Sequence, residues 1–114
     1  MGNPVVHWEI AGNDREKLQS FYGSLFDWKI DDDNPMNYGM VSTGAEPGGG
    51  IAATEGKMPP YLTFYVQVDD LQASLDKAIE LGGKIVVPPM PIPNIGAFAM
   101  FSDPEGNVVG IFKE

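Results

Sequence analysis

The chain nearly repeats itself, and this repeat limits the folds that it can adopt. Val6–Ile10, followed by an amphipathic segment, returns as Leu62–Val66 with another amphipathic segment behind it. In the same way, Tyr38–Ser42 returns as Phe98–Ser102, so that the offset is 56 residues at the front of each copy and 60 at the back. Loops absorb such length differences, whereas paired strands cannot. The sequence therefore predicts one small domain built from two copies of one unit.

Each copy is predicted to contain a strand, a helix and three further strands. Apolar and polar residues alternate in Val5–Ile10 and in Tyr61–Val68, as they do in half-buried strands. Asn13–Asp14 and Asp69–Asp70 then offer side-chain oxygens that can cap a helix. Behind the caps, apolar residues recur at helical spacing: Leu18, Phe21, Tyr22, Leu25 and Phe26 in one copy, and Leu71, Leu75, Ala78 and Ile79 in the other. We place module one at residues 1–56 and module two at 60–114 of a single domain.

Two later segments indicate how the strands are connected. Asp103–Asn107 contains a proline and a glycine at turn positions, which predicts a hairpin between Phe98–Phe101 and Val108–Phe112. Pro88–Pro93 contains four prolines in six residues. Proline cannot donate to a strand ladder, so this segment is predicted to be a loop.

Composition excludes several classes of partner. A chain of 114 residues can bury one core without cross-links, and the absence of cysteine agrees with a reducing compartment. The formal net charge of -9 repels nucleic acids and anionic membranes. No apolar stretch has membrane-spanning length, and the opening residues do not resemble a signal peptide. We therefore expect a cytoplasmic protein that binds neither nucleic acid nor membranes.

Three features form a recognisable pattern. They are the paired modules, Phe21–Tyr22 with Leu25–Trp28 at the end of the first helix, and Asp103–Asn107 before the last strand. Together they resemble the glyoxalase, bleomycin-resistance protein and extradiol dioxygenase superfamily, also called vicinal oxygen chelate proteins, over essentially the whole chain. The resemblance implies an α+β fold. Two tandem βαβββ modules would form an incomplete eight-stranded mixed β-barrel around a cavity, with the helices outside. It also implies a homodimer.

The resemblance further implies where a metal would be held, because catalytic members bind it through the first and last strands of each module. The matching positions are His7 and Gly50 in module one and Thr63 and Gly110 in module two. Only His7 is a ligand type, whereas a divalent ion needs at least three convergent groups. Glu9 lies on the same strand face as His7 but would need help from elsewhere. We therefore expect no metal and no cofactor.

His7 and Glu9 are the candidate catalytic residues. A histidine titrates near neutral pH and can act as a general base, and a carboxylate in a cavity can act as an acid or base. Each also has a plainer interpretation: a half-buried imidazole bonded to a backbone carbonyl, and a solvated carboxylate. The candidate ligand contacts are the residues that strand parity or the repeat places near these groups, namely His7, Tyr38, Tyr61, Thr63, Tyr65, Phe98 and Phe112.

Three functions stay open at this point. An aromatic lining with a few hydroxyls suits a flat or apolar small molecule, so metal-independent binding of such a molecule is our leading hypothesis. The first alternative is a lyase or isomerase related to lactoylglutathione lyase, either metal-dependent or using His7 and Glu9 as acid–base groups. The second alternative is a protein-interaction module. Whether the chain catalyses a reaction is left open.

Overall fold

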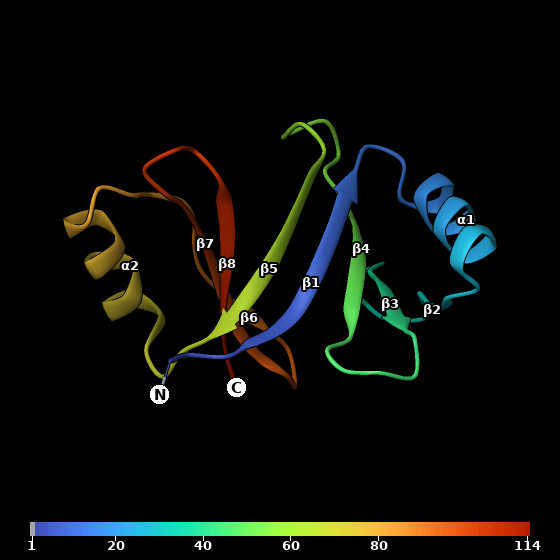
Figure 1. Ribbon diagram of the computed structural model, residues 1–114, viewed down its shortest axis with the longest axis horizontal. Helices are drawn as coiled ribbons and strands as arrows, with labels where there is room; N and C mark the ends of the chain where they lie inside the picture. The colour runs from blue at the N-terminus through green and yellow to red at the C-terminus, as the bar shows by residue number, and fades with distance from the viewer. Residues whose placement is uncertain (1) are drawn as a thin grey trace. The chain divides into compact units, whose positions relative to one another are not determined.

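The computed structural model describes residues 2–114, which form eight strands and two helices (Figure 1). They fall into two compact units. One unit is His7–Leu62, and the other joins Thr63–Glu114 to the N-terminal residues up to Val6. The division of a single domain into modules at residues 1–56 and 60–114 stays a prediction.

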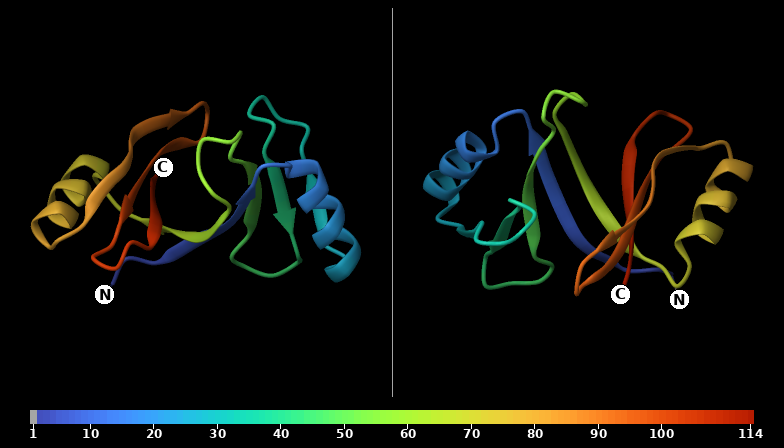
Figure 2. Two further views of the ribbon diagram at one scale, coloured as in Figure 1. Left: turned by 90° about the horizontal axis from the view of Figure 1, so that it is seen from above. Right: turned by 180° about the vertical axis from the view of Figure 1, so that it is seen from behind.

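The unit His7–Leu62 contains the first βαβββ motif. Its elements are β1 (Val5–Gly12), α1 (Arg15–Phe26), β2 (Lys29–Asp31), β3 (Gly39–Ser42) and β4 (Gly49–Ala53). The first two residues of β1 belong to the other unit. The strands lie in the order β2-β3-β4-β1, with β4 parallel to β1 and antiparallel to β3. In this register Gly50 of β4 lies between Glu9 of β1 and Met40 of β3. Figure 2 shows α1 alongside this group of strands.

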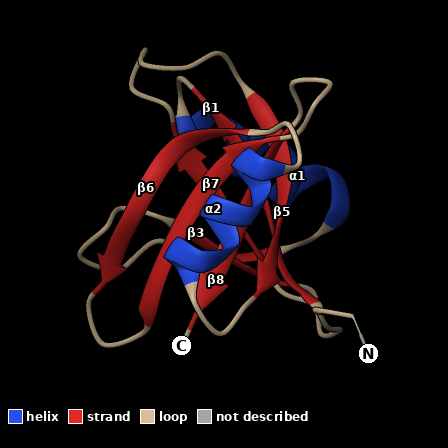
Figure 3. Cartoon of the chain, turned by 90° about the vertical axis from the view of Figure 1, so that its left-hand side faces the viewer, coloured by secondary structure: helices blue, strands red, loops and turns tan. Residues whose placement is uncertain are grey.

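The second unit repeats the motif. Its elements are β5 (Tyr61–Gln67), α2 (Leu71–Glu80), β6 (Lys84–Ile92), β7 (Gly96–Ser102) and β8 (Val108–Lys113). The first two residues of β5 belong to the unit His7–Leu62. The order is β5-β8-β7-β6, with β8 parallel to β5 and antiparallel to β7. Figure 3 shows α2 lying across these strands. The α+β class and the tandem βαβββ motifs with mixed pairing are therefore confirmed, whereas the cavity that a barrel would enclose stays a prediction.

Both helices begin where the sequence predicts. The Asp14 side chain accepts a hydrogen bond from the Lys17 amide at 3.0 Å, and Asp70 accepts one from Ala73 at 3.0 Å. Each carboxylate thereby satisfies an amide that has no partner within the helix. At the other end of α2, Gly82 adopts a φ of 104°, which a residue with a side chain rarely takes.

The two helices bury different amounts of apolar surface. Leu71 and Leu75 of α2 form a buried cluster with Ala99 and Ile111 of the sheet. In α1, by contrast, no residue is fully buried. Its helical stripe is largely exposed: Phe21 is 58%, Leu25 57% and Phe26 53% exposed.

The prolines of Pro88–Pro93 do not produce the predicted loop. Strand β6 runs from Lys84 to Ile92 through most of them and pairs with β7 as the edge strand of its unit. Its register shifts between Ile85 and Val87 and again between Val87 and Met90. An edge strand tolerates proline because one row of its amides need not pair. The prediction of a loop was wrong, although the exclusion of a central strand holds.

None of the helices in residues 2–114 is long and apolar enough to cross a membrane.

Candidate functional site

Four of the predicted site residues meet in the unit His7–Leu62. The Tyr38 hydroxyl donates a hydrogen bond to Oε1 of Glu9 at 2.7 Å, and the Tyr61 hydroxyl donates one to Oε2 at 2.6 Å. Nε2 of His7 lies 2.9 Å from the Tyr38 hydroxyl. We call these four side chains the Glu9 network. Strand β1 brings His7 and Glu9 to one face because residues two apart on a strand point the same way.

Glu9 is the most deeply buried member of the network, with 5% of its surface exposed. A carboxylate removed from water is costly unless strong donors replace the lost hydration. The two tyrosine hydroxyls do this, and their short distances are typical of charge-assisted hydrogen bonds. The network is therefore a buried acceptor surrounded by phenol donors.

Burial and charge shift the titration of two neighbours of Glu9. Burial, together with the charge of Glu9 and the hydrogen bond to it, raises the pKa of Tyr61 far above its ordinary value. Burial also lowers the pKa of His7, and the charge of Glu9 opposes that shift without cancelling it. At neutral pH, Tyr61 is therefore protonated and His7 is uncharged.

The hydrogen bonds also define where the protons lie. Tyr38 has one hydroxyl proton, which it donates to Glu9. The Tyr38 oxygen also lies at hydrogen-bond distance from Nε2 of His7, and the tautomer of the imidazole sets which of the two donates. The hydroxyl protons of Tyr38 and Tyr61 both point toward Glu9.

A glycine makes room for Tyr38. A Cβ built at Gly50 would overlap the Tyr38 ring, so the ring occupies the space of a side chain at residue 50. Gly49 similarly makes room for the Trp8 ring, and in the other unit Gly110 makes room for Tyr65. In both units, therefore, the last strand carries a glycine against which a tyrosine ring lies.

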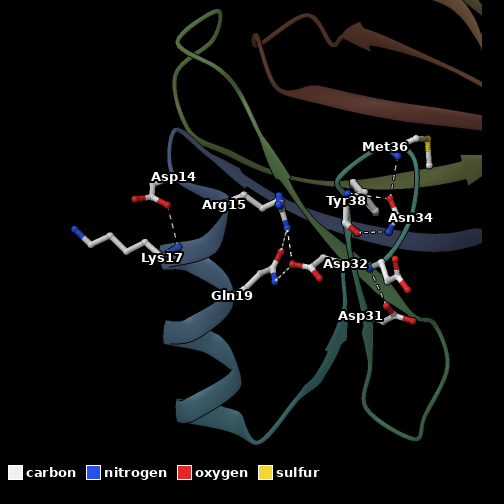
Figure 4. Close-up of polar contacts among 10 residues, drawn as sticks. Asp14, Arg15, Lys17, Gln19, Asp31, Asp32, Asn34, Met36 and Tyr38 are labelled. Carbon is white, nitrogen blue, oxygen red and sulfur yellow. Dashed lines mark hydrogen bonds and ion pairs between the residues drawn. The ribbon is translucent and has the colours of Figure 1, made fainter.

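The segment before β3 holds the Tyr38 backbone in place (Figure 4). Nδ2 of Asn34 donates to the Tyr38 carbonyl at 2.6 Å, and Oδ1 of Asn34 accepts from the Tyr38 amide at 3.1 Å. The same Oδ1 accepts from the Met36 amide at 3.1 Å. Asn34 was not among the predicted site residues. The Asn34–Pro35 dipeptide is a turn signal that could have indicated it.

The same segment is tied to α1. Arg15 forms an ion pair with Asp32 at 3.2 Å, and Nε2 of Gln19 donates to the same carboxylate at 3.3 Å. The hydrogen bond from Arg15, followed by that from Gln19, lowers the pKa of Asp32. Figure 4 shows these side chains converging from the helix on the segment that leads to Tyr38.

The remaining predicted contacts lie in the second unit. The Thr63 hydroxyl donates a hydrogen bond to the Val108 carbonyl at 2.6 Å. Buried Tyr65 meets Phe98 edge to face at 6.3 Å, and Phe98 pairs across the strands with Phe112. These rings form an aromatic cluster, and their contact with a ligand stays a prediction.

The repeat relates the two clusters. At its offsets, Glu9 corresponds to Tyr65 and Tyr38 corresponds to Phe98. The same two positions thus hold a hydrogen-bonded polar pair in one unit and an aromatic pair in the other.

The side chains of metal-ligand type at the Glu9 network are His7 and Glu9. Within residues 2–114, no group of three or more His, Cys, Asp or Glu side chains comes together in a way that could hold a metal ion. Both oxygens of Glu9 accept tyrosine protons, and Gly50 has no side chain to offer. This donor set does not fit a divalent ion, which needs at least three convergent protein groups.

Comparison with known proteins identifies the family. Residues 5–111 match the model of the Glyoxalase/Bleomycin resistance protein/Dioxygenase superfamily. The chain belongs to this superfamily, which confirms the resemblance seen in the sequence.

One relative is CFP32 of Mycobacterium bovis, which carries a provisional glyoxylase name and is 34% identical over 115 residues. The alignment covers 92% of this chain and 43% of CFP32, so the chain spans less than half the length of that relative.

Solved structures share the fold at low identity. A superfamily member from Vibrio splendidus 12B01 has a TM-score of 0.63 at 15% identity, with 99% of this chain and 100% of that one covered. Methylmalonyl-CoA epimerase from Mycobacterium tuberculosis has a TM-score of 0.65 at 15% identity, with 96% and 86% covered. At such identities the likeness concerns the fold alone.

Proposed function

We propose that the chain binds a small apolar or aromatic molecule without a metal ion, and that His7, Tyr38 and Tyr61 contribute to the binding site. The observation that carries this proposal is the position of Tyr38. Its ring fills the space at Gly50, where the family resemblance would place a metal ligand. Its hydroxyl donates a hydrogen bond to Oε1 of Glu9. An aromatic ring at this position, beside a carboxylate that already accepts hydrogen bonds, suits the binding of an organic molecule better than the coordination of a metal ion.

The direction of the protons favours binding over glyoxalase-type chemistry. Such chemistry builds negative charge on a substrate oxygen, which an enzyme stabilises with a metal ion or with donors aimed at that oxygen. In the Glu9 network the donors are aimed at Glu9 itself. Turning them toward a substrate would remove two hydrogen bonds from a buried carboxylate, which is costly.

The test is a thermal-shift and calorimetric screen of neutral aromatic compounds against tag-free protein, with and without EDTA. We expect a saturable ligand whose affinity does not change with the chelator and falls in Tyr38→Phe and His7→Ala. Tyr22→Phe is the matched control, because Tyr22 stacks on Trp28 away from the network. Loss of binding in EDTA, or a His7-dependent stabilisation by nickel, zinc, manganese or iron(II), would move a metal-dependent lyase to first place.

We also propose that the protein is a cytoplasmic homodimer. The exposed aromatic and aliphatic face of α1 supports self-association, because apolar side chains gathered on one face commonly mark an interface. The absence of cysteine from the sequence supports a reducing compartment.

A further inference from the structure

A cavity of about 370 Å³ lies between the second half of α2 and the strands β5, β7 and β8. We call it the α2 cavity, and Figure 3 shows α2 lying across these strands. All of its lining residues belong to the unit that contains Thr63–Glu114, so it shares no residue with the Glu9 network. We propose that the α2 cavity binds a small apolar molecule that carries one carboxylate, with the carboxylate at Lys77. This is a site beyond the proposed function.

The packing of α2 explains why the cavity exists. Leu71 and Leu75 are buried against the sheet, and the next residue on the same face at helical spacing is Ala78. The methyl group of Ala78 is too short to fill the space that a leucine would take, so apolar surface of the sheet stays uncovered. The apolar lining residues are Val66, Ala78, Leu81, Phe101, Pro104 and Ile111. An apolar cavity holds water poorly, so an apolar molecule of suitable size fills it favourably.

Two charged side chains, Lys77 and Asp103, line the cavity. Asp103 is held by its own turn. Its Oδ1 accepts from the amides of Glu105 and Asn107, each at 2.9 Å, and its Oδ2 accepts from Nδ2 of Asn107 at 2.8 Å. Within residues 2–114, Lys77 forms no ion pair. Its ammonium group lies at the end of a flexible four-carbon chain and can therefore reach an anion at the cavity.

These charges favour a ligand with a negative group over one with a positive group. A carboxylate is attracted by Lys77, whereas an ammonium group is repelled by it. To pair with Asp103, a cationic ligand would compete with the three hydrogen bonds of the turn. Lys77 is exposed, so water screens its attraction. Burial of the apolar part should therefore supply most of the affinity, and Lys77 should add a modest preference for the anion.

The experiment compares three probes that share one apolar part: 4-phenylbutyrate, 4-phenyl-1-butanol and 4-phenylbutylamine. Each is titrated at neutral pH and low ionic strength into isotope-labelled, tag-free protein, and NMR chemical shifts report both the affinity and the site. We expect shifts at Ala78, Leu81 and Phe101. The carboxylate should bind roughly two- to fivefold more tightly than the alcohol, as one exposed ion pair allows, and the amine should bind most weakly.

Two pairs of variants separate the effect of charge from the effect of shape. Lys77→Gln should abolish the preference for the carboxylate over the alcohol and leave binding of the alcohol unchanged. Lys113→Gln removes the same charge from the same unit outside the cavity lining and should keep the preference. Ala78→Leu should fill the cavity and abolish binding of all three probes, whereas Ala73→Leu, at an exposed position of the same helix, should not.

Equal affinities for the carboxylate and the amine, or an unchanged preference in Lys77→Gln, would overturn the proposal. So would shifts confined to the Glu9 network, or no binding of any probe to wild type. Tyr38→Phe should leave binding at the α2 cavity unchanged, so this proposal and the proposed function can fail separately. Should Ala78→Leu not fold, the location of the shifts in wild type decides by itself.

Discussion

Glu9 is the residue on which the site depends, because its buried carboxylate sets the orientation of its neighbours. Strand alternation predicts that Glu9 and His7 share a face, and they do. Neither alternation nor the repeat predicts that two tyrosines, 29 and 52 residues further along the chain, donate to the same carboxylate. That arrangement depends on long-range strand pairing and on the space at Gly50.

The sole histidine makes the electrostatics of the network measurable. We expect NMR titration to place the pKa of His7 below the ordinary value of histidine, since burial is the larger cause of its shift. In Glu9→Gln the pKa should fall further, because the charge that raises it is removed. A His7 pKa above the ordinary value would contradict this account of the site.

The same shift predicts how stability depends on pH. Because the folded pKa of His7 is depressed, the unfolded chain binds the proton more readily. The contribution of His7 is therefore complete above the unfolded pKa and is lost as pH falls toward the folded pKa. Urea unfolding between pH 8 and about pH 5 should show this decline, and His7→Asn should flatten it. Asp32 and Asp103, whose pKa values are lowered, titrate below this window.

Gly50 offers a test of packing. Gly50→Ala should destabilise the protein by about 2 kcal/mol, because the new methyl group must displace the Tyr38 ring. The cost should be smaller in the Tyr38→Ala background, where the space is vacant, and a double-mutant cycle by chemical denaturation measures this coupling. Additive effects of the two substitutions would show that the ring and residue 50 do not compete for space.

At the scale of elements, local chemistry predicts where helices begin and where the chain turns better than it predicts which strand lies at the edge of a sheet. The caps at Asp14 and Asp70 are confirmed because capping involves only neighbouring residues. The Pro88–Pro93 segment was misassigned because its tolerance for proline depends on β6 being an edge strand, which is a property of the whole sheet.

The segment between β2 and β3 carries a prediction of its own. Asn34→Ala removes two hydrogen bonds to the Tyr38 backbone and one to the Met36 amide. We therefore expect the free energy of unfolding to fall by about 1–2 kcal/mol. We also expect the pKa of His7 to change in the same direction as in Tyr38→Phe. Asn34→Asp keeps the acceptor and should behave in between. Asp33→Ala, at an exposed position of the same segment, is the control. An unchanged His7 titration in Asn34→Ala would show that Asn34 does not position Tyr38.

At the scale of the whole molecule, α1 presents a largely exposed apolar face that includes Phe21, Leu25 and Phe26. We expect light scattering coupled to size exclusion to show a dimer for wild type and a monomer for Phe21→Ser combined with Leu25→Ser. Leu81→Ser, at a similarly exposed residue beyond α2, should leave the dimer intact. A wild-type monomer at high protein concentration would contradict the prediction.

The sequence by itself determined the two βαβββ modules, the helix caps and the superfamily. Periodicity, capping and turn residues act over short distances, and the repeat shows the same order of elements in both copies. It also placed His7 and Glu9 on one strand face. Only the tertiary structure decided which side chains those two residues meet. Tyr38 reaches Glu9 because β4 presents a glycine beneath its ring and Asn34 holds its backbone. Contacts of this kind depend on residues far apart in the chain, and no local pattern encodes them.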